Sequence, residues 1–217
     1  MIVPFTAHTE HHLFEHPPTG GYDMQFRLVL RGNLPPSKSG TVDAKHRIRS
    51  ELHPQLKTLW QQDENLKEWF MPPPIGSERD ELRARADEYE RYGFRFVPLV
   101  TLVEAGGCSL DILMLRRQDP NKLFTGAGDL DARVKTLLDA LRMPNQRSEL
   151  GGATPTPDED PFYVLLEDDR LIHELTITTD RLLVPPLPGE PERDIIAIIN
   201  VKTRTFSAQL GHFLDGR

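Results

Sequence analysis

Residues 128–141 read GDLDARVKTLLDAL, which is the clearest helical pattern in the chain. Apolar residues recur there at i, i+3, i+4 and i+7, the spacing of one helical face. These residues are Val134, Leu137, Leu138 and Leu141. The pattern predicts a helix over 129–142, called the motif helix here. Its leucines are expected to pack against a sheet that includes two later strands, 171–179 and 194–202.

The segments around the motif helix predict an α+β fold with a single mixed sheet and helices packed on one face. Strand patterns occupy 22–31, 94–103, 108–116, 171–179 and 194–202. The turn EAGG joins the second and third of these strands, which predicts a hairpin, and Pro98 predicts an edge position or a bulge. Two further helices are predicted, over 42–61 and 77–89.

The composition is that of one globular domain in a reducing compartment. The 217 residues are 38% hydrophobic and 27% charged, enough to bury a single core. Residues 1–20 lack periodicity and predict an irregular arm, and 21–217 are expected to form the domain. No apolar run approaches the ~18 residues that span a bilayer, and the N-terminus carries no secretory signal. Because Cys108 is the single cysteine, no intrachain disulfide is expected, and the sequence predicts a cytoplasmic protein without a membrane segment.

The net charge of −7 argues against promiscuous binding to a polyanion, because such binding comes from Lys and Arg residues that neutralise phosphates. A DNA-binding function therefore requires basic residues gathered on one face. The candidates are Lys38, Lys45 and Arg47 near the first helix, and Arg116, Arg117 and Arg133 around the motif helix. Each arginine around the motif helix, taken singly, is equally well explained as a surface residue. The basic stretch near the first helix, which also includes His46 and Arg49, can instead be the solvated face of that helix.

The start of the motif helix supplies candidate chemistry. Asp129 and Asp131 stand two residues apart, which puts both carboxylates on one side only where the backbone is extended. This requirement is met if Asp129 ends the extended segment and Asp131 lies in the first helical turn. Lys135 follows Asp131 by about one turn.

A second acidic segment, Glu167, Asp168 and Asp169, follows a short apolar run and precedes a strand. Bringing Asp169 close to Asp129 and Asp131 without a cation would cost on the order of 4 kcal/mol per pair, at ~4 Å and an effective dielectric of ~20. Mg²⁺ is typically held by one or two carboxylates together with waters. Grouped carboxylates would therefore imply a bound cation.

Both acidic segments also have a purely structural explanation. Asp is a preferred residue at the start of a helix, where it accepts backbone N–H bonds and complements the helix dipole. Gly128 and Asp129 before an amphipathic run can therefore mark only a helix start. Three consecutive acids can likewise be a solvated charge run.

The order of these motifs resembles the RusA family of Holliday junction resolvases, whose signature is D-[IL]-D-N-x-x-K…DAL…DD. Here Asp129-Leu-Asp131 precedes Lys135, Leu138-Asp-Ala-Leu141 and the doublet Asp168-Asp169. The opening strand followed by Asn33-Leu-Pro-Pro-Ser37 also resembles the family's first strand and loop. The resemblance covers about half of the chain, and the ranges 62–107 and 143–161 stand as insertions relative to short family members.

The resemblance implies a RusA-like nuclease of DNA recombination and repair that cuts branched DNA as a homodimer and uses Mg²⁺, with Mn²⁺ as a substitute. It implies that Asp129, Asp131 and Asp169 are catalytic metal ligands, that Asp168 assists in binding the metal, and that Lys135 stabilises charge at the scissile phosphate. Ala132 departs from the family pattern, because it stands where the family has Asn.

Two rival hypotheses remain beside the nuclease. The first is a catalytically degraded relative that binds DNA or a protein partner without cutting, which Ala132 and the net charge of −7 favour. The second is an unrelated α+β domain in which the Asp residues only begin a helix. The positions of Asp129, Asp131 and Asp169 relative to one another discriminate among these hypotheses.

Overall fold

The computed structural model describes residues 24–37, 41–64, 66, 81–103, 106–117, 130–186, 188–189, 191 and 195–205. These residues contain three α-helices, α1 (Thr41–Gln62), α2 (Glu81–Glu88) and α3 (Leu130–Leu141). They contain seven strands, β1 (Gln25–Gly32), β2 (Glu90–Arg91), β3 (Phe94–Val100), β4 (Gly106–Arg116), β5 (Phe162–Leu166), β6 (Ile172–Arg181) and β7 (Ile195–Thr205). The predicted arm over 1–20 lies outside the described residues.

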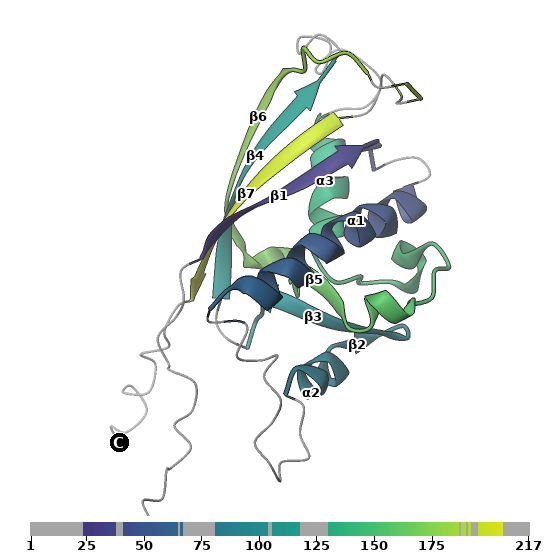
Figure 1. The fold of residues 1–217 in the computed structure, drawn as a ribbon, viewed down its shortest axis with the longest axis vertical. Coiled ribbons are helices and arrows are strands. Elements are labelled where there is room, and N and C mark those ends of the chain that lie inside the picture. The colour runs from purple at the N-terminus through teal and green to yellow at the C-terminus, as the bar shows by residue number, and fades with distance from the viewer. Residues whose placement is uncertain are drawn as a thin grey trace, which may run out of the picture.

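The larger sheet has four strands in the order β1-β7-β4-β6. Its β7 runs antiparallel to both neighbours, and β6 runs parallel to β4. Figure 1 shows α1 and α3 on the same face of this sheet. The prediction of an α+β fold, with a mixed sheet that carries helices on one face, is confirmed at this level.

The predicted single sheet and the predicted hairpin are wrong. A second sheet has the order β2-β3-β5, with β2 antiparallel and β5 parallel to β3. The strands that were expected to form a hairpin, β3 and β4, therefore lie in different sheets. Burial gives the reason, because every residue of β5 and every residue of β3 except Arg95 is buried. Strands that are buried on both faces are typical of parallel pairing, and β3 and β5 pair in parallel with each other.

The second sheet separates two apolar clusters. One face of β3 and β5 carries Phe94, Phe96, Phe162 and Val164, and these pack in a small cluster with Met143 and Leu150. The opposite face contributes Val97, Leu99, Tyr163 and Leu165 to the main core between the larger sheet and the helices. Residues 62–107 and 143–161, which the sequence presents as insertions, thus supply strands and side chains of the described core.

The apolar stripe of α3 packs as predicted. Leu137 and Leu141 are fully buried in the main core, and Leu138 packs against its border together with Ile177 of β6. The same core contains Ile199 of β7. The predicted packing of the motif helix against a sheet that includes β6 and β7 is therefore confirmed.

The structure also bears on the first helix, on Pro98 and on membrane-spanning segments. Helix α1 runs without a break through Pro54, and its apolar stripe is buried. The short β2 pairs only with Phe94 and Arg95, so within the described residues Pro98 has a strand neighbour on one side only, which is the predicted edge position. No helix in the described ranges is long and apolar enough to cross a membrane.

Candidate functional site

The first turn of α3 carries Asp131, as the sequence predicts. Asp131 is exposed, and its Oδ1 accepts a hydrogen bond of 2.7 Å from the backbone N–H of Ala132. Lys135, one turn later, is also exposed. Asp129 lies outside the described residues, so its placement beside Asp131 stays a prediction.

An open pocket of about 470 Å³ lies between α3, the short 3-10 helix Asp169–Leu171 and the middle of β6. Its polar lining consists of Asp131, Lys135, Asp139 and Asp169. Its apolar lining consists of Leu130, Val134, Leu138 and Ile177. The structure therefore brings Asp169 to the same pocket as Asp131 and Lys135, although these residues come from separate segments of the chain.

The two carboxylates of the acidic doublet have different partners. Asp168 caps the short 3-10 helix Asp169–Leu171 and accepts bonds from the N–H (3.0 Å) and Nε (2.9 Å) of Arg170. These bonds, above all the one from the side chain of Arg170, lower the pKa of Asp168. The side chain of Asp169 is half exposed, and its Oδ2 lies 3.7 Å from Nε of Arg142. Asp169 is therefore more available to a ligand than Asp168.

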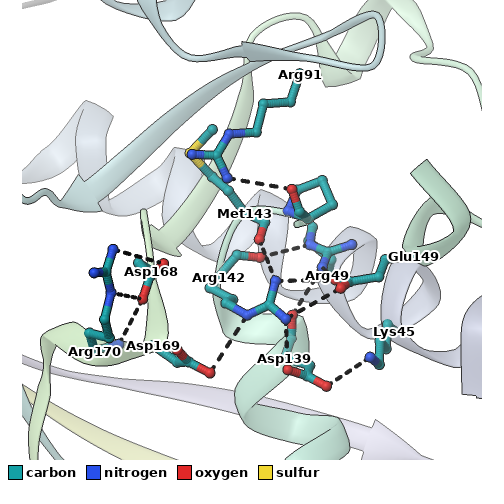
Figure 2. A network of polar contacts seen from close by, with 11 residues as sticks. Lys45, Arg49, Arg91, Asp139, Arg142, Met143, Glu149, Asp168, Asp169 and Arg170 are labelled. Atoms are coloured by element: carbon teal, nitrogen blue, oxygen red, sulfur yellow. Dashed lines mark hydrogen bonds and ion pairs between the residues drawn. The ribbon is translucent and has the colours of Figure 1, made fainter. Parts of the chain in front are cut away.

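Behind Asp169 lies a buried group of charges, called the ion network here, which consists of Lys45, Arg49, Asp139, Arg142 and Glu149. Figure 2 shows Arg142 between Asp169 on one side and Asp139 and Glu149 on the other. Arg142 donates to Oδ1 of Asp139 at 2.8 Å, to both oxygens of Glu149 at 3.2 and 3.3 Å, and to the carbonyl of Met143 at 2.8 Å. The guanidinium is thus fixed by three chain segments.

The ion network engages both oxygens of Asp139. Its Oδ2 lies 2.7 Å from Nζ of Lys45, and its Oδ1 accepts from Arg142. Arg49 donates to the carbonyls of Asp139 (3.0 Å) and Arg142 (3.1 Å), and burial lowers the pKa of its guanidinium to about 10. Asp139 therefore lines the pocket with a carboxylate already held by two cations, whereas Asp169 is held by one distant nitrogen.

Four of the predicted DNA-binding residues, Arg47, Arg116, Arg117 and Arg133, are called the arginine cluster here. Arg47 donates to the carbonyl of Asn33, and Arg133 donates to the carbonyl of the next residue, Leu34. This loop also meets the first turn of α3, because Ser37 N–H donates to the carbonyl of Ala132 at 3.1 Å. The loop after β1 thus lies between the start of α1 and the start of α3.

The other end of the arginine cluster lies where β4 ends. Burial lowers the pKa of Arg133, and the positive charge of Arg116 lowers it further. Next along β4, Arg117 donates from Nε to the carbonyl of Val184 at 3.1 Å. Carbonyl acceptors carry no formal charge, so a hydrogen bond to a carbonyl does not by itself neutralise a guanidinium. The structure gathers positive charge beside Asp131 in a chain whose net charge is −7.

Two other predicted DNA-binding residues are placed differently. Lys45 is mostly buried in its ion pair with Asp139, and Lys38 lies outside the described residues. Arg47 also lies 3.7 Å from Glu51, so its charge is partly balanced. The role of Lys45 in DNA binding stays a prediction, but in this structure its ammonium group stabilises the fold.

The described residues hold no group of three or more His, Cys, Asp or Glu side chains placed to bind a metal ion together. Asp131 and Asp169 nevertheless suit Mg²⁺ chemically, because both line one open pocket and both carry a carboxylate. A hard divalent cation with such ligands keeps several waters and needs only one or two carboxylates. The donor set therefore fits a weakly held Mg²⁺ ion at this pocket.

No family model, no curated protein and no solved structure matches the chain.

The sequence did not reveal the ion network. Asp139 and Arg142 stand on the motif helix, but Glu149 falls after that helix and Arg49 lies on α1. Arg49 belongs to a basic stretch that suggests a solvated face, yet it is 1% exposed. The one available signal is that Arg49 and His53, four residues apart, border the apolar stripe of α1.

Proposed function

We propose that this protein is a Mg²⁺-dependent endonuclease of the Holliday junction resolvase type, which cuts branched DNA. The observation that carries the proposal is that Asp131, Lys135 and Asp169 line one pocket. The arginine cluster beside this pocket supports it, because phosphate contacts supply most of the affinity for DNA. The motifs that resemble the RusA family fall on these same residues.

The chemistry follows from the residues at the pocket. Asp131 and Asp169 would hold the metal through carboxylate oxygens, and Asp129 would join them if the chain enters α3 in an extended conformation. When bound, Mg²⁺ supplies an activated water and neutralises charge at the phosphate under attack. Lys135 presents a point charge to the same phosphate from one helical turn beyond Asp131. The arginine cluster binds flanking phosphates and orients the strand.

The proposal extends to assembly and location. A four-way junction needs two symmetric nicks, which a homodimer with two-fold symmetry supplies. The single cysteine is buried, and burial raises the pKa of its thiol to about 12, so Cys108 remains a protonated thiol at neutral pH. We therefore propose a homodimer that acts in the reducing environment of the cytoplasm.

A second candidate function is binding to branched DNA without cutting. Ala132 favours it, because this residue offers no side-chain amide to orient a carboxylate or a water. The contact between Asp169 and Arg142 also favours it, since this carboxylate already has a cationic neighbour. The two candidates share the DNA-binding surface and differ only in catalysis.

A nicking assay on a synthetic four-way junction in Mg²⁺ or Mn²⁺ tests the proposal. We expect the wild type to cut, and Asp131→Asn and Asp169→Asn each to abolish cutting while junction binding survives. The matched control is Asp111→Asn, because Asp111 is an exposed aspartate of β4 that does not line the pocket. If wild-type protein cuts no junction, flap or duplex with either metal, the nuclease proposal is wrong and binding alone remains.

A further inference from the structure

We propose that Leu183 and Val184 form an apolar wedge that enters the base stack at the branch point of the DNA bound by the arginine cluster. The inference rests on the proposed function, because it requires that the arginine cluster contacts DNA. It adds a way in which the protein distinguishes a branched substrate from an ordinary duplex.

The exposure of this segment is unusual for its side chains. Leu183 is 82% exposed and Val184 is 61% exposed, although Leu182 just before them is 7% exposed. Single exposed apolar residues are common on protein surfaces and by themselves indicate nothing. The residues beside Leu183 and Val184 indicate what this pair binds.

The wedge is fixed to the basic end of β4. Leu182 N–H donates to the carbonyl of Arg116 at 2.6 Å, and Val184 accepts from Arg117 through its carbonyl at 3.1 Å. Pro185 follows, and a residue before proline is restricted to extended backbone. The two apolar side chains are thus presented on a short, stiff segment, which reduces the entropy lost when they insert.

Charge and size identify the partner. The segment 182–184, which holds the wedge, is hydrogen-bonded to Arg116 and Arg117, and the positive charge of Arg116 also acts on Arg133. A protein partner of ordinary stability needs about 800 Å² on each side, far more than two side chains provide. A DNA base step needs only an apolar wedge of this size, together with cations for the neighbouring phosphates. The wedge therefore fits nucleic acid better than a protein surface.

The branch point is the favourable place for insertion. Entering a continuous duplex requires two stacked base pairs to separate, and this unstacking opposes binding. At a branch point the stack is already interrupted, so the same contact is made with less opposing energy. The wedge should therefore raise affinity for a junction more than affinity for a duplex.

The experiment compares the double variant Leu183→Ser, Val184→Ser with Val103→Ser. Val103 is 79% exposed and precedes β4, so it lies at the end of that strand opposite Arg116. Binding is measured in Ca²⁺ without Mg²⁺, on a four-way junction that carries 2-aminopurine at the branch point and on a duplex of the same length. Because all three side chains are exposed, we expect every variant to fold with an unchanged melting temperature.

We expect wild type and Val103→Ser to raise the 2-aminopurine fluorescence and to prefer the junction. The double variant should lose the fluorescence change and about tenfold of the preference for junction over duplex, with duplex affinity unchanged. If the double variant keeps both the fluorescence change and the preference, the wedge is overturned and the proposed function stands. If wild type binds neither DNA at low salt, both are overturned.

Discussion

The two ends of α3 use the same types of side chain in opposite ways. At its start, Asp131 and Lys135 are exposed, and Arg133 contacts a backbone carbonyl. At its end, Asp139 and Arg142 are buried, and both take part in ion pairs with other segments. Charges buried with carboxylate partners hold chain segments together, whereas exposed charges such as Asp131 and Lys135 are accessible to a ligand. The burial of each charge, rather than its type, therefore separates the fold from the candidate site.

Removing a charge from the buried end gives the largest expected effect. We expect Arg142→Met to lower the free energy of unfolding by about 3–5 kcal/mol, because Asp139 and Glu149 would each lose a buried cation. Urea denaturation measures the change. The matched control, Arg133→Met at the opposite end of α3, should change it by less than about 1 kcal/mol. Equal losses of unfolding free energy in both variants would contradict the difference between the two ends of α3.

Lys45 gives an intermediate effect that sharpens the comparison. This residue is predicted from the sequence to bind DNA, but its ammonium group lies 2.7 Å from Asp139. We expect Lys45→Gln to destabilise the protein by about 1.5–3 kcal/mol, as for other hydrogen bonds to charged groups. Junction affinity of the folded variant should stay at the wild-type level. A weakened junction affinity without a loss of stability would show that Lys45 binds DNA and does not stabilise the fold.

The buried His53 and the partly buried His46 give the smallest effect. Burial is the main cause that lowers the pKa of His46 and of His53 below 6.5, and His46 faces the charges of Arg49 and Glu159. The folded state favours the neutral form of both imidazoles, whereas the unfolded chain takes up protons near pH 6.5, so their contribution is present above that pH and is lost as the pH falls below it. Glu159 and Asp168 have lowered pKa values and titrate in a more acidic range.

We therefore expect the wild type to lose stability as the pH falls below about 6.5. His46→Leu should flatten that loss, because His46 packs among the rings of Phe94 and Phe162 and its Nδ1 has no hydrogen-bond partner. Urea titrations at several pH values provide the measurement. An unchanged pH dependence in this variant would show that His46 is not a source of the loss.

Periodicity predicted the elements but not their partners. The leucines of α3 and the position of Asp131 follow from spacing alone, because a helix fixes which residues share a face. The apolar runs Phe94–Val100 and Phe162–Leu166 suit a strand in either sheet. Their pairing therefore depends on which apolar surfaces of the folded chain they bury. The sequence could not predict the ion network, because Arg49 donates a hydrogen bond to the carbonyl of Arg142, which lies 93 residues away in the chain. Contacts of that separation leave no local pattern.

The salt dependence of junction binding tests most directly whether the arginine cluster is the DNA-binding surface. For the wild type we expect log K to fall with log salt, and Arg116→Gln with Arg133→Gln should flatten the slope by roughly 1–2 units, about 0.9 for each lost phosphate contact. Lys202→Gln with Arg204→Gln is the matched control, because Arg204 pairs with Gly107 at the opposite end of β4. Its slope should equal that of the wild type. A wild-type slope near zero, or equal flattening by the control pair, would contradict the account.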